Sequence, residues 1–137
     1  MSDDLMEWIR VGERPVALVL RAAMRPERTT FVTPAEFTHQ LGFVVYPRSG
    51  RVEPHLHLPL ERRLTGTSEV LLVRSGRMLV EFYDEDRRLI ATRELTTGDV
   101  VLFHACGHGI RMLEDSVLLE IKQGPYMGED EKERFTP

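Results

Sequence analysis

Short apolar runs rich in β-branched residues alternate with polar turns along most of the chain. The run Val16–Leu20 favours a buried strand over a helix because it is short and partly β-branched. Later runs of similar length are bounded by turns that contain Gly, Asp or Ser. The further predicted strands are Thr29–Val32, Phe43–Tyr46, Val52–Leu58, Glu69–Val73, Arg77–Tyr83, Arg88–Thr92, Val100–Phe103, Ile110–Leu113 and Val117–Lys122. Short strands without a long helical period between them indicate an antiparallel sandwich or barrel.

Two segments predict brief helical turns before the dense strand region. Asp3 or Asp4 can cap a turn in which apolar residues of Leu5–Ile9 share one side at helical spacing. In Thr33–Glu36 the threonine stands at the N-cap, the proline at the first helical position, and the glutamate can reach back to the cap backbone. We therefore expect short N-terminal helical turns in an otherwise all-β chain.

The length of 137 residues predicts one domain, which at this size buries about two-thirds of the surface that its unfolded chain exposes. We expect residues 1–40 to supply N-terminal strands, residues 41–123 the core, and residues 124–137 a charged tail. Within that tail, Gly128–Arg134 has the composition of a mobile segment. The net charge of −4, with 18 basic and 22 acidic residues, provides no basic stripe and argues against a nucleic-acid partner.

The single cysteine, Cys106, excludes an intrachain disulfide and favours a reducing compartment. The segment Met1–Arg10 carries acidic residues where a secretory signal carries positive charge, and no apolar signal core follows it. No apolar run is long enough to span a bilayer. The sequence therefore predicts a cytoplasmic protein without a membrane partner.

His55 and His57 are the most informative chemical pattern in the sequence. In an extended strand, residues two apart point to the same face, so this pair can chelate a metal ion. A third histidine, His108, follows late in the chain. A carboxylate stands between them at Glu69, with Glu61 as its rival.

Two segments resemble the conserved motifs of the cupin family. Gly50–Gly76 is similar to the first motif, which runs from a glycine through a His-x-His pair to a glutamate and, after six residues, a glycine. Gly98–His108 is similar to the second motif, a Gly-Asp turn followed by a strand and a histidine. The resemblance implies an antiparallel double-stranded β-helix, or jelly-roll barrel, that forms a homodimer. It implies a metal held by His55, His57, Glu69 and His108.

The match departs from the cupin pattern at the carboxylate and in the second motif. Glu69 lies twelve positions beyond His57, whereas the cupin glutamate follows by four or five. Glu61 has the short spacing but is not followed by the glycine. Strand register favours Glu69, because it opens a predicted strand that can pair with the strand of the histidines. That strand is expected to continue through the Ser75-Gly76 turn into a tight hairpin. In the second motif, His104 stands where proline is usual.

Imidazoles and a carboxylate suit a divalent transition metal, namely Zn, Fe, Mn, Ni or Cu. Four protein ligands leave an open position on a five- or six-coordinate ion, which is what a catalytic metal requires. Cys106 lies two residues before His108. It is therefore either a further ligand in the same cavity or a small buried structural residue.

Other polar residues are candidates for catalysis or substrate binding beside the metal. Each also has a plain interpretation as an exposed or ion-paired side chain. The catalytic candidates are His104, Tyr46 and Glu120, and the substrate-binding candidates are Arg48, Arg63 and Lys122.

The leading functional hypothesis is a metal-dependent enzyme, of oxygenase or isomerase type, acting on a small polar metabolite such as a sugar derivative or an organic acid. The first alternative is a non-catalytic module that binds or senses a small molecule. The second is a metal-free sugar isomerase or epimerase that uses His or Tyr as acid and base. All three hypotheses have a small-molecule partner.

Overall fold

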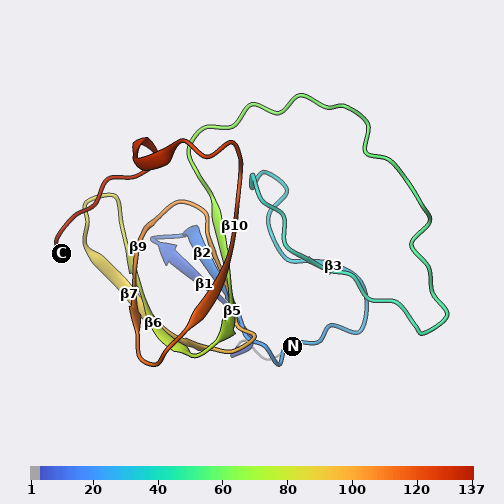
Figure 1. Cartoon of the computed structure of the whole chain (residues 1–137), viewed down its shortest axis with the longest axis horizontal. Helices are drawn as coiled ribbons and strands as arrows, with labels where there is room; N and C mark the ends of the chain where they lie inside the picture. Colours follow the sequence, from blue (N-terminus) through green and yellow to red (C-terminus); the bar gives the residue numbers. More distant parts are fainter. Residues whose placement is uncertain (1–3) are drawn as a thin grey trace. The chain divides into compact units, whose positions relative to one another are not determined.

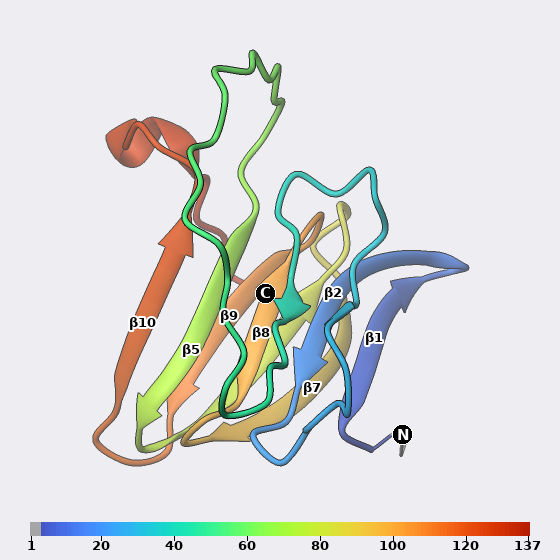
Figure 2. The same ribbon diagram turned by 90° about the vertical axis from the view of Figure 1, so that its right-hand side faces the viewer.

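The computed structural model describes residues 4–137, and its strands pair antiparallel throughout. The predicted all-β antiparallel class is therefore confirmed (Figures 1 and 2). The elements are β1 (Met6–Val11), β2 (Arg14–Leu20), β3 (Thr30–Phe31), β4 (Gly42–Phe43), β5 (Glu69–Ser75), β6 (Arg77–Tyr83), β7 (Leu89–Thr96), β8 (Val100–Phe103), β9 (Gly107–Met112), β10 (Val117–Lys122) and the 3₁₀ turn η1 (Gly128–Glu131). None of the described residues forms a helix long and apolar enough to cross a membrane.

The described chain forms two compact units. Unit 1 contains the described residues up to Met24 together with Thr67–Pro137, and unit 2 is Arg25–Gly66. Unit 2 carries the two-stranded sheet of β3 and β4, and all other strands belong to unit 1. A single domain stays a prediction.

Unit 1 is built from two sheets that share an apolar core. The larger sheet has the order β1-β2-β8-β5-β10 and the smaller has the order β7-β6-β9; Figure 2 shows the strands of the larger sheet side by side. Both sheets contribute to one cluster of buried residues, for example Val19 and Val101 from the larger and Val80 and Phe82 from the smaller. Residues at alternate positions of β6 are buried, as expected for a strand with one face on a core.

The predicted hairpin at Ser75-Gly76 is wrong. Strand β5 pairs with β8 and β10, whereas β6 pairs with β7 and β9, so the chain passes from one sheet to the other at this point. Gly76 has a φ of 95°, and a Cβ there would lie 2.2 Å from the Ser116 hydroxyl oxygen. The glycine is therefore required by a tight corner between sheets, where an L side chain has neither the conformation nor the room.

The expected N-terminal helical turn is replaced by strand β1. Asp3, one of its two predicted caps, lies outside the described residues. From Met6 onward the chain pairs with β2, with Trp8 opposite Leu18. The aromatic and β-branched side chains of this segment suit a strand. Since β1 forms a ladder of backbone hydrogen bonds with β2, tertiary pairing overrides a weak helical pattern.

The expected helix at Thr33–Glu36 is also absent, because its cap residue bonds elsewhere. The Thr33 hydroxyl accepts the Leu41 N–H at 3.1 Å and donates to the Gln40 side-chain oxygen at 2.8 Å. The Gln40 amide donates to the carbonyls of Pro34 and Phe37. These side-chain hydrogen bonds close a compact loop. The Thr33 hydroxyl therefore does not cap a helix.

The predicted strand Val52–Leu58 does not form, and Phe43–Tyr46 is reduced to β4. In the described structure the chain from residue 51 to residue 68 has no strand. Leu56 and Leu58 are 92% and 84% exposed, so their apolar side chains cover no core. Pro54 and Pro59 remove two backbone donors from the segment, which weakens any ladder that it could join.

A two-pronged ion pair links the two sheets of unit 1. Arg93 on β7 donates to both carboxylate oxygens of Glu7 on β1, at 2.7 and 2.5 Å. This hydrogen bond and the positive charge lower the pKa of Glu7, against a smaller opposing effect of burial. A lowered carboxyl pKa stabilises the fold above the unfolded-state pKa of about 4.3, and the stabilisation is lost as the pH falls through the folded-state pKa.

We expect Glu7→Gln to lower the free energy of unfolding by roughly 0.5–1 kcal/mol at pH 7, because both side chains are about one-third exposed. Urea titrations from pH 7 to pH 3 measure this effect, and the deficit should shrink below pH ~4. Glu13→Gln is the matched control, since Glu13 is exposed. A deficit that persists unchanged to pH 3 would contradict the assignment.

Candidate functional site

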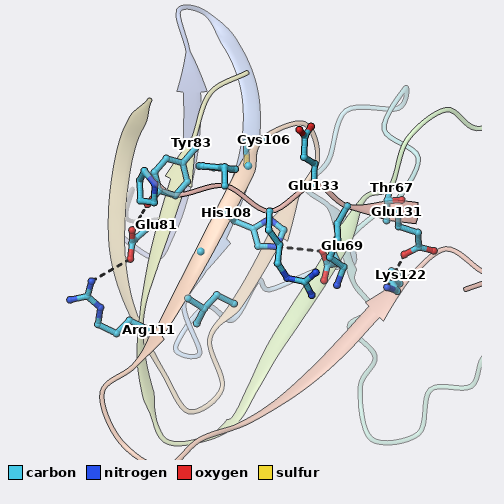
Figure 3. A pocket seen from close by; sticks show the side chains of 17 residues that line it. Thr67, Glu69, Glu81, Tyr83, Cys106, His108, Arg111, Lys122, Glu131 and Glu133 are labelled. Carbon is cyan, nitrogen blue, oxygen red and sulfur yellow. Dashed lines mark hydrogen bonds and ion pairs between the residues drawn. The ribbon is translucent and has the colours of Figure 1, made fainter. Parts of the chain in front are cut away.

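A cavity of about 850 Å³ lies in unit 1, between the sheets' strands β5, β6, β9 and β10 and the C-terminal segment (Figure 3). Its lining mixes acidic, basic and aromatic side chains. The residues are Thr67, Glu69, Glu81, Tyr83, Cys106, Gly107, His108, Gly109, Ile110, Arg111, Lys122, Glu131, Lys132, Glu133, Arg134, Phe135 and Pro137. Such a lining suits a small polar ligand that carries charge or several hydroxyl groups.

Glu69 and His108 meet inside this cavity, as Figure 3 shows. Glu69 opens β5, and His108 is the second residue of β9. The His108 Nε2 atom lies 3.4 Å from a Glu69 carboxylate oxygen, and both side chains are largely shielded, at 28% and 21% exposure. The hydrogen bond to His108 lowers the pKa of Glu69, partly offset by burial, with smaller contributions from the charges of His108, Lys122 and Lys132.

The His108 ring is held in place by Phe103. The two rings stack with centroids 3.8 Å apart and planes 9° apart. The Nδ1 atom of His108 is buried and has no hydrogen-bond partner in the described structure. Stacking therefore fixes the plane of the imidazole, and Nε2 is the nitrogen directed at Glu69.

The spacing of these two donor atoms fits a shared metal ion. Two ligands bound at about 2.1 Å with a tetrahedral angle between them are about 3.4 Å apart. The Nε2 and carboxylate oxygen atoms are separated by that distance. A neutral imidazole and a carboxylate are also ligand types that divalent first-row metals accept.

The structure brings the predicted metal ligands together in two pairs. His55 and His57 lie in unit 2, with ring centroids 5.2 Å apart and both side chains exposed. The Nδ1 atom of His55 is 2.7 Å from the carbonyl oxygen of Glu53. Glu69 and His108 form the pair in unit 1. Over residues 4–137, no group of three or more His, Cys, Asp or Glu side chains is arranged to hold a metal ion.

Glu61, the rival carboxylate, forms a surface ion pair in unit 2. Its carboxylate lies 3.5 Å from Arg63, and the two side chains are 79% and 91% exposed. Arg63, a substrate-binding candidate, is thereby engaged with a neighbouring residue. Tyr46 and Arg48 are exposed residues of the same unit.

Cys106 lines the cavity and packs against the apolar core. Burial raises the pKa of its thiol to about 12. Its packing against the core suits a small structural residue, and a metal ligand stays the alternative interpretation.

The remaining candidates on unit 1 separate into one that lines the cavity and two that do not. Lys122, at the end of β10, lines it. Glu120 is exposed on the same strand and does not line the cavity. His104 is half-buried, and its backbone N–H donates to the carbonyl of Val16 at 2.9 Å. It too lies outside the cavity lining.

Sequence reasoning missed a second polar cluster in the cavity. The Tyr83 hydroxyl donates to Glu81, which raises the pKa of Tyr83. Arg111 on β9 approaches the same carboxylate at 3.9 Å. Glu81 lies between the buried residues Val80 and Phe82 of β6, so a glutamate in a strongly apolar strand was the signal for this cluster.

The C-terminal segment, predicted as a mobile charged tail, makes specific contacts at the cavity. Lys122 donates to Glu131 at 3.0 Å, and Arg87 donates to Glu133 at 2.9 Å. The ring of Phe135 meets that of Tyr83 edge to face, with centroids 5.1 Å apart. The segment thus closes part of the cavity with its own side chains (Figure 3).

Comparisons of the chain with family models, curated proteins and solved structures gave no match.

Proposed function

We propose that this chain is a cupin-like protein that binds a divalent transition metal in the unit 1 cavity and acts on a small polar metabolite there. The observation that carries the proposal is the Glu69–His108 pair, whose donor atoms have the separation of two ligands on one ion. The pair lies in a cavity large enough for a metabolite beside the metal.

The order of the strands supports the jelly-roll part of the proposal. From β5 to β10, every connection except β6–β7 passes from one sheet to the other. Repeated crossing of this kind winds a chain into a double-stranded β-helix. In such a fold, consecutive strands lie in opposite sheets, so both sheets contribute side chains to a shared interior.

His55 and His57 are the proposed further ligands. Their rings lie close together in unit 2, and both are exposed and able to bind. Side chains two residues apart on an extended segment lie on the same face, so the pair can bind one ion. Variants at these two positions test whether they are ligands.

The other residues of the cavity have roles that follow from their chemistry. A bound divalent metal supplies Lewis acidity toward a substrate oxygen. Lys122 and Arg111 provide positive charge for an anionic or hydroxyl-rich substrate. Tyr83, hydrogen-bonded to Glu81, can hold a proton at its hydroxyl oxygen beside the substrate. Phe103 keeps the His108 ring oriented.

Elemental analysis and zinc titration of the purified protein test this proposal. We expect about one metal ion per chain, and at least about tenfold weaker binding in His55→Ala and in His57→Ala. Glu69→Gln and Glu61→Gln form a matched pair that identifies the carboxylate. Only the first should weaken binding, because Glu61 is engaged with Arg63 at the surface.

Metal-free protein that turns over its substrate at the full rate would refute the proposal. Zinc affinity that is unchanged in both histidine variants but lost in Glu69→Gln would restrict the site to unit 1. The homodimer and the cytoplasmic location predicted from the sequence stay predictions, which sedimentation analysis and localisation of a tagged chain can test.

A further inference from the structure

We propose that Lys122 is the anion-binding group of the cavity, that Glu131 occupies it as an internal substitute, and that a small organic carboxylate replaces Glu131 and releases the C-terminal strap. The strap is defined here as residues 124–137. This inference rests on the proposed function only in assuming that the unit 1 cavity binds a small ligand.

The Glu131 carboxylate is bound on both of its oxygens. One oxygen accepts the Met127 N–H at 2.8 Å, and the other accepts a hydrogen bond from Lys122 at 3.0 Å. The Glu131 side chain is only 9% exposed and the Lys122 side chain 20% exposed. Surface ion pairs are usually much more exposed to solvent, so the Glu131–Lys122 pair is unusually well shielded.

Lys122 is also oriented by an aromatic ring of the strap. Its ammonium group lies 4.8 Å from the centroid of Tyr126. The ring and the carboxylate together hold the ammonium group at the cavity wall, where Thr67 and Glu69 are further lining residues. A substrate carboxylate that binds Lys122 must therefore compete with Glu131 for the same donor.

A second anchor holds the far end of the strap. Phe135 contacts Tyr83 edge to face, and the Arg87 guanidinium lies 5.4 Å from the Phe135 centroid. Arg87 also pairs with Glu133 at 2.9 Å. The strap thus runs from β10 to the β6–β7 turn across one side of the cavity, so loss of the Lys122 contact loosens one of its two ends.

The position of Glu131 favours a carboxylate over a phosphate. The cavity lining carries both signs of charge, so net charge does not choose between the two anions. Its acidic residues besides Glu131 are Glu69, Glu81 and Glu133, and its basic residues besides Lys122 are Arg111, Lys132 and Arg134. A singly charged carboxylate reproduces the charge and the planar shape that Glu131 already places there.

Hydrogen exchange of the strap and NMR titration with sodium L-lactate test the proposal, with sodium chloride at matched ionic strength as the reference. Saturating lactate should speed amide exchange over residues 125–133 by about tenfold. Inorganic phosphate should have a smaller effect. An equal or larger response to phosphate would overturn the choice of a carboxylate ligand.

Two variants are expected to change lactate affinity in opposite directions. Glu131→Gln keeps an oxygen for the Met127 N–H but removes the competing charge, so lactate should bind about five- to tenfold more tightly. Lys122→Met keeps the length of the side chain but removes the anion-binding group, so lactate should bind at least about tenfold more weakly. Both variants should speed exchange in the strap, because both break the same ion pair.

Glu114→Gln is the charge-matched control. Glu114 pairs with Arg77 at 3.2 Å and neither residue lines the cavity, so its loss should leave lactate affinity within about twofold. Equal gains in affinity in Glu114→Gln and Glu131→Gln would show that net charge alone causes the effect and would overturn the proposal. A Glu131→Gln variant that binds lactate no more tightly than the original chain would also overturn it.

Zinc titration of the same proteins separates this inference from the proposed function. Normal zinc binding with no lactate response in any variant would refute the displacement of Glu131 alone. The predicted lactate responses in a protein that binds no metal would refute the metal proposal alone.

Discussion

The substitution His108→Ala is expected to lower zinc affinity at least about a hundredfold, which is the largest functional effect predicted here. It removes the nitrogen donor and leaves Glu69 as the remaining ligand of the pair in unit 1. It also removes the ring that stacks on Phe103. Competition titration against a zinc-binding dye measures the loss directly.

His104→Ala is the control for this experiment, because His104 is close in sequence but does not line the cavity. Its zinc affinity should match that of the original chain. The pair of variants also addresses the metal-free alternative, in which His104 serves as a base. If His104→Ala lost activity and His108→Ala kept both its activity and its metal, the metal proposal would fail.

The substitution Asp99→Ala is expected to lower the free energy of unfolding by about 3–5 kcal/mol. Asp99 is 4% exposed and lies just before β8. Its carboxylate accepts the backbone N–H groups of Ala22 at 2.8 Å and Thr96 at 2.9 Å, and it pairs with Arg21 at 3.2 Å. Alanine would leave two backbone donors and a guanidinium without this acceptor.

Urea unfolding at pH 7 measures this loss, and Asp99→Asn is the informative comparison. Asparagine keeps one oxygen as an acceptor but no longer neutralises Arg21, so we expect about half of the alanine effect. Equal stability of the alanine variant and the original chain would show that the contacts of the Asp99 carboxylate do not stabilise the fold.

Local pattern located most of the strands of unit 1. The predicted limits of Arg77–Tyr83, Val100–Phe103 and Val117–Lys122 agree with β6, β8 and β10. These segments are short, apolar or alternating, and bounded by Gly, Asp or Ser turns. Period-two alternation and turn residues act within a few positions, so they can be detected in the sequence without knowledge of pairing.

Pairing partners were harder to predict than strand positions. Ser75-Gly76 has the composition of a hairpin turn but forms a corner between sheets. The same positive-φ glycine serves both geometries, so the local residues do not distinguish them. The segment Val52–Leu58 shows the same limit, since its alternation predicts a strand but forms no ladder among the described residues.

The sequence by itself determined the all-β class, the positions of most strands in unit 1 and the choice of Glu69 and His108 as candidate ligands. Tertiary structure alone decided that these two side chains meet, because Glu69 pairs across to Phe103 and the Phe103 ring stacks on His108. It also decided that Glu131 reaches Lys122. Backbone propensity acts locally, whereas contacts between distant residues depend on which sheet edges pair, and that is set by burial summed over the whole core.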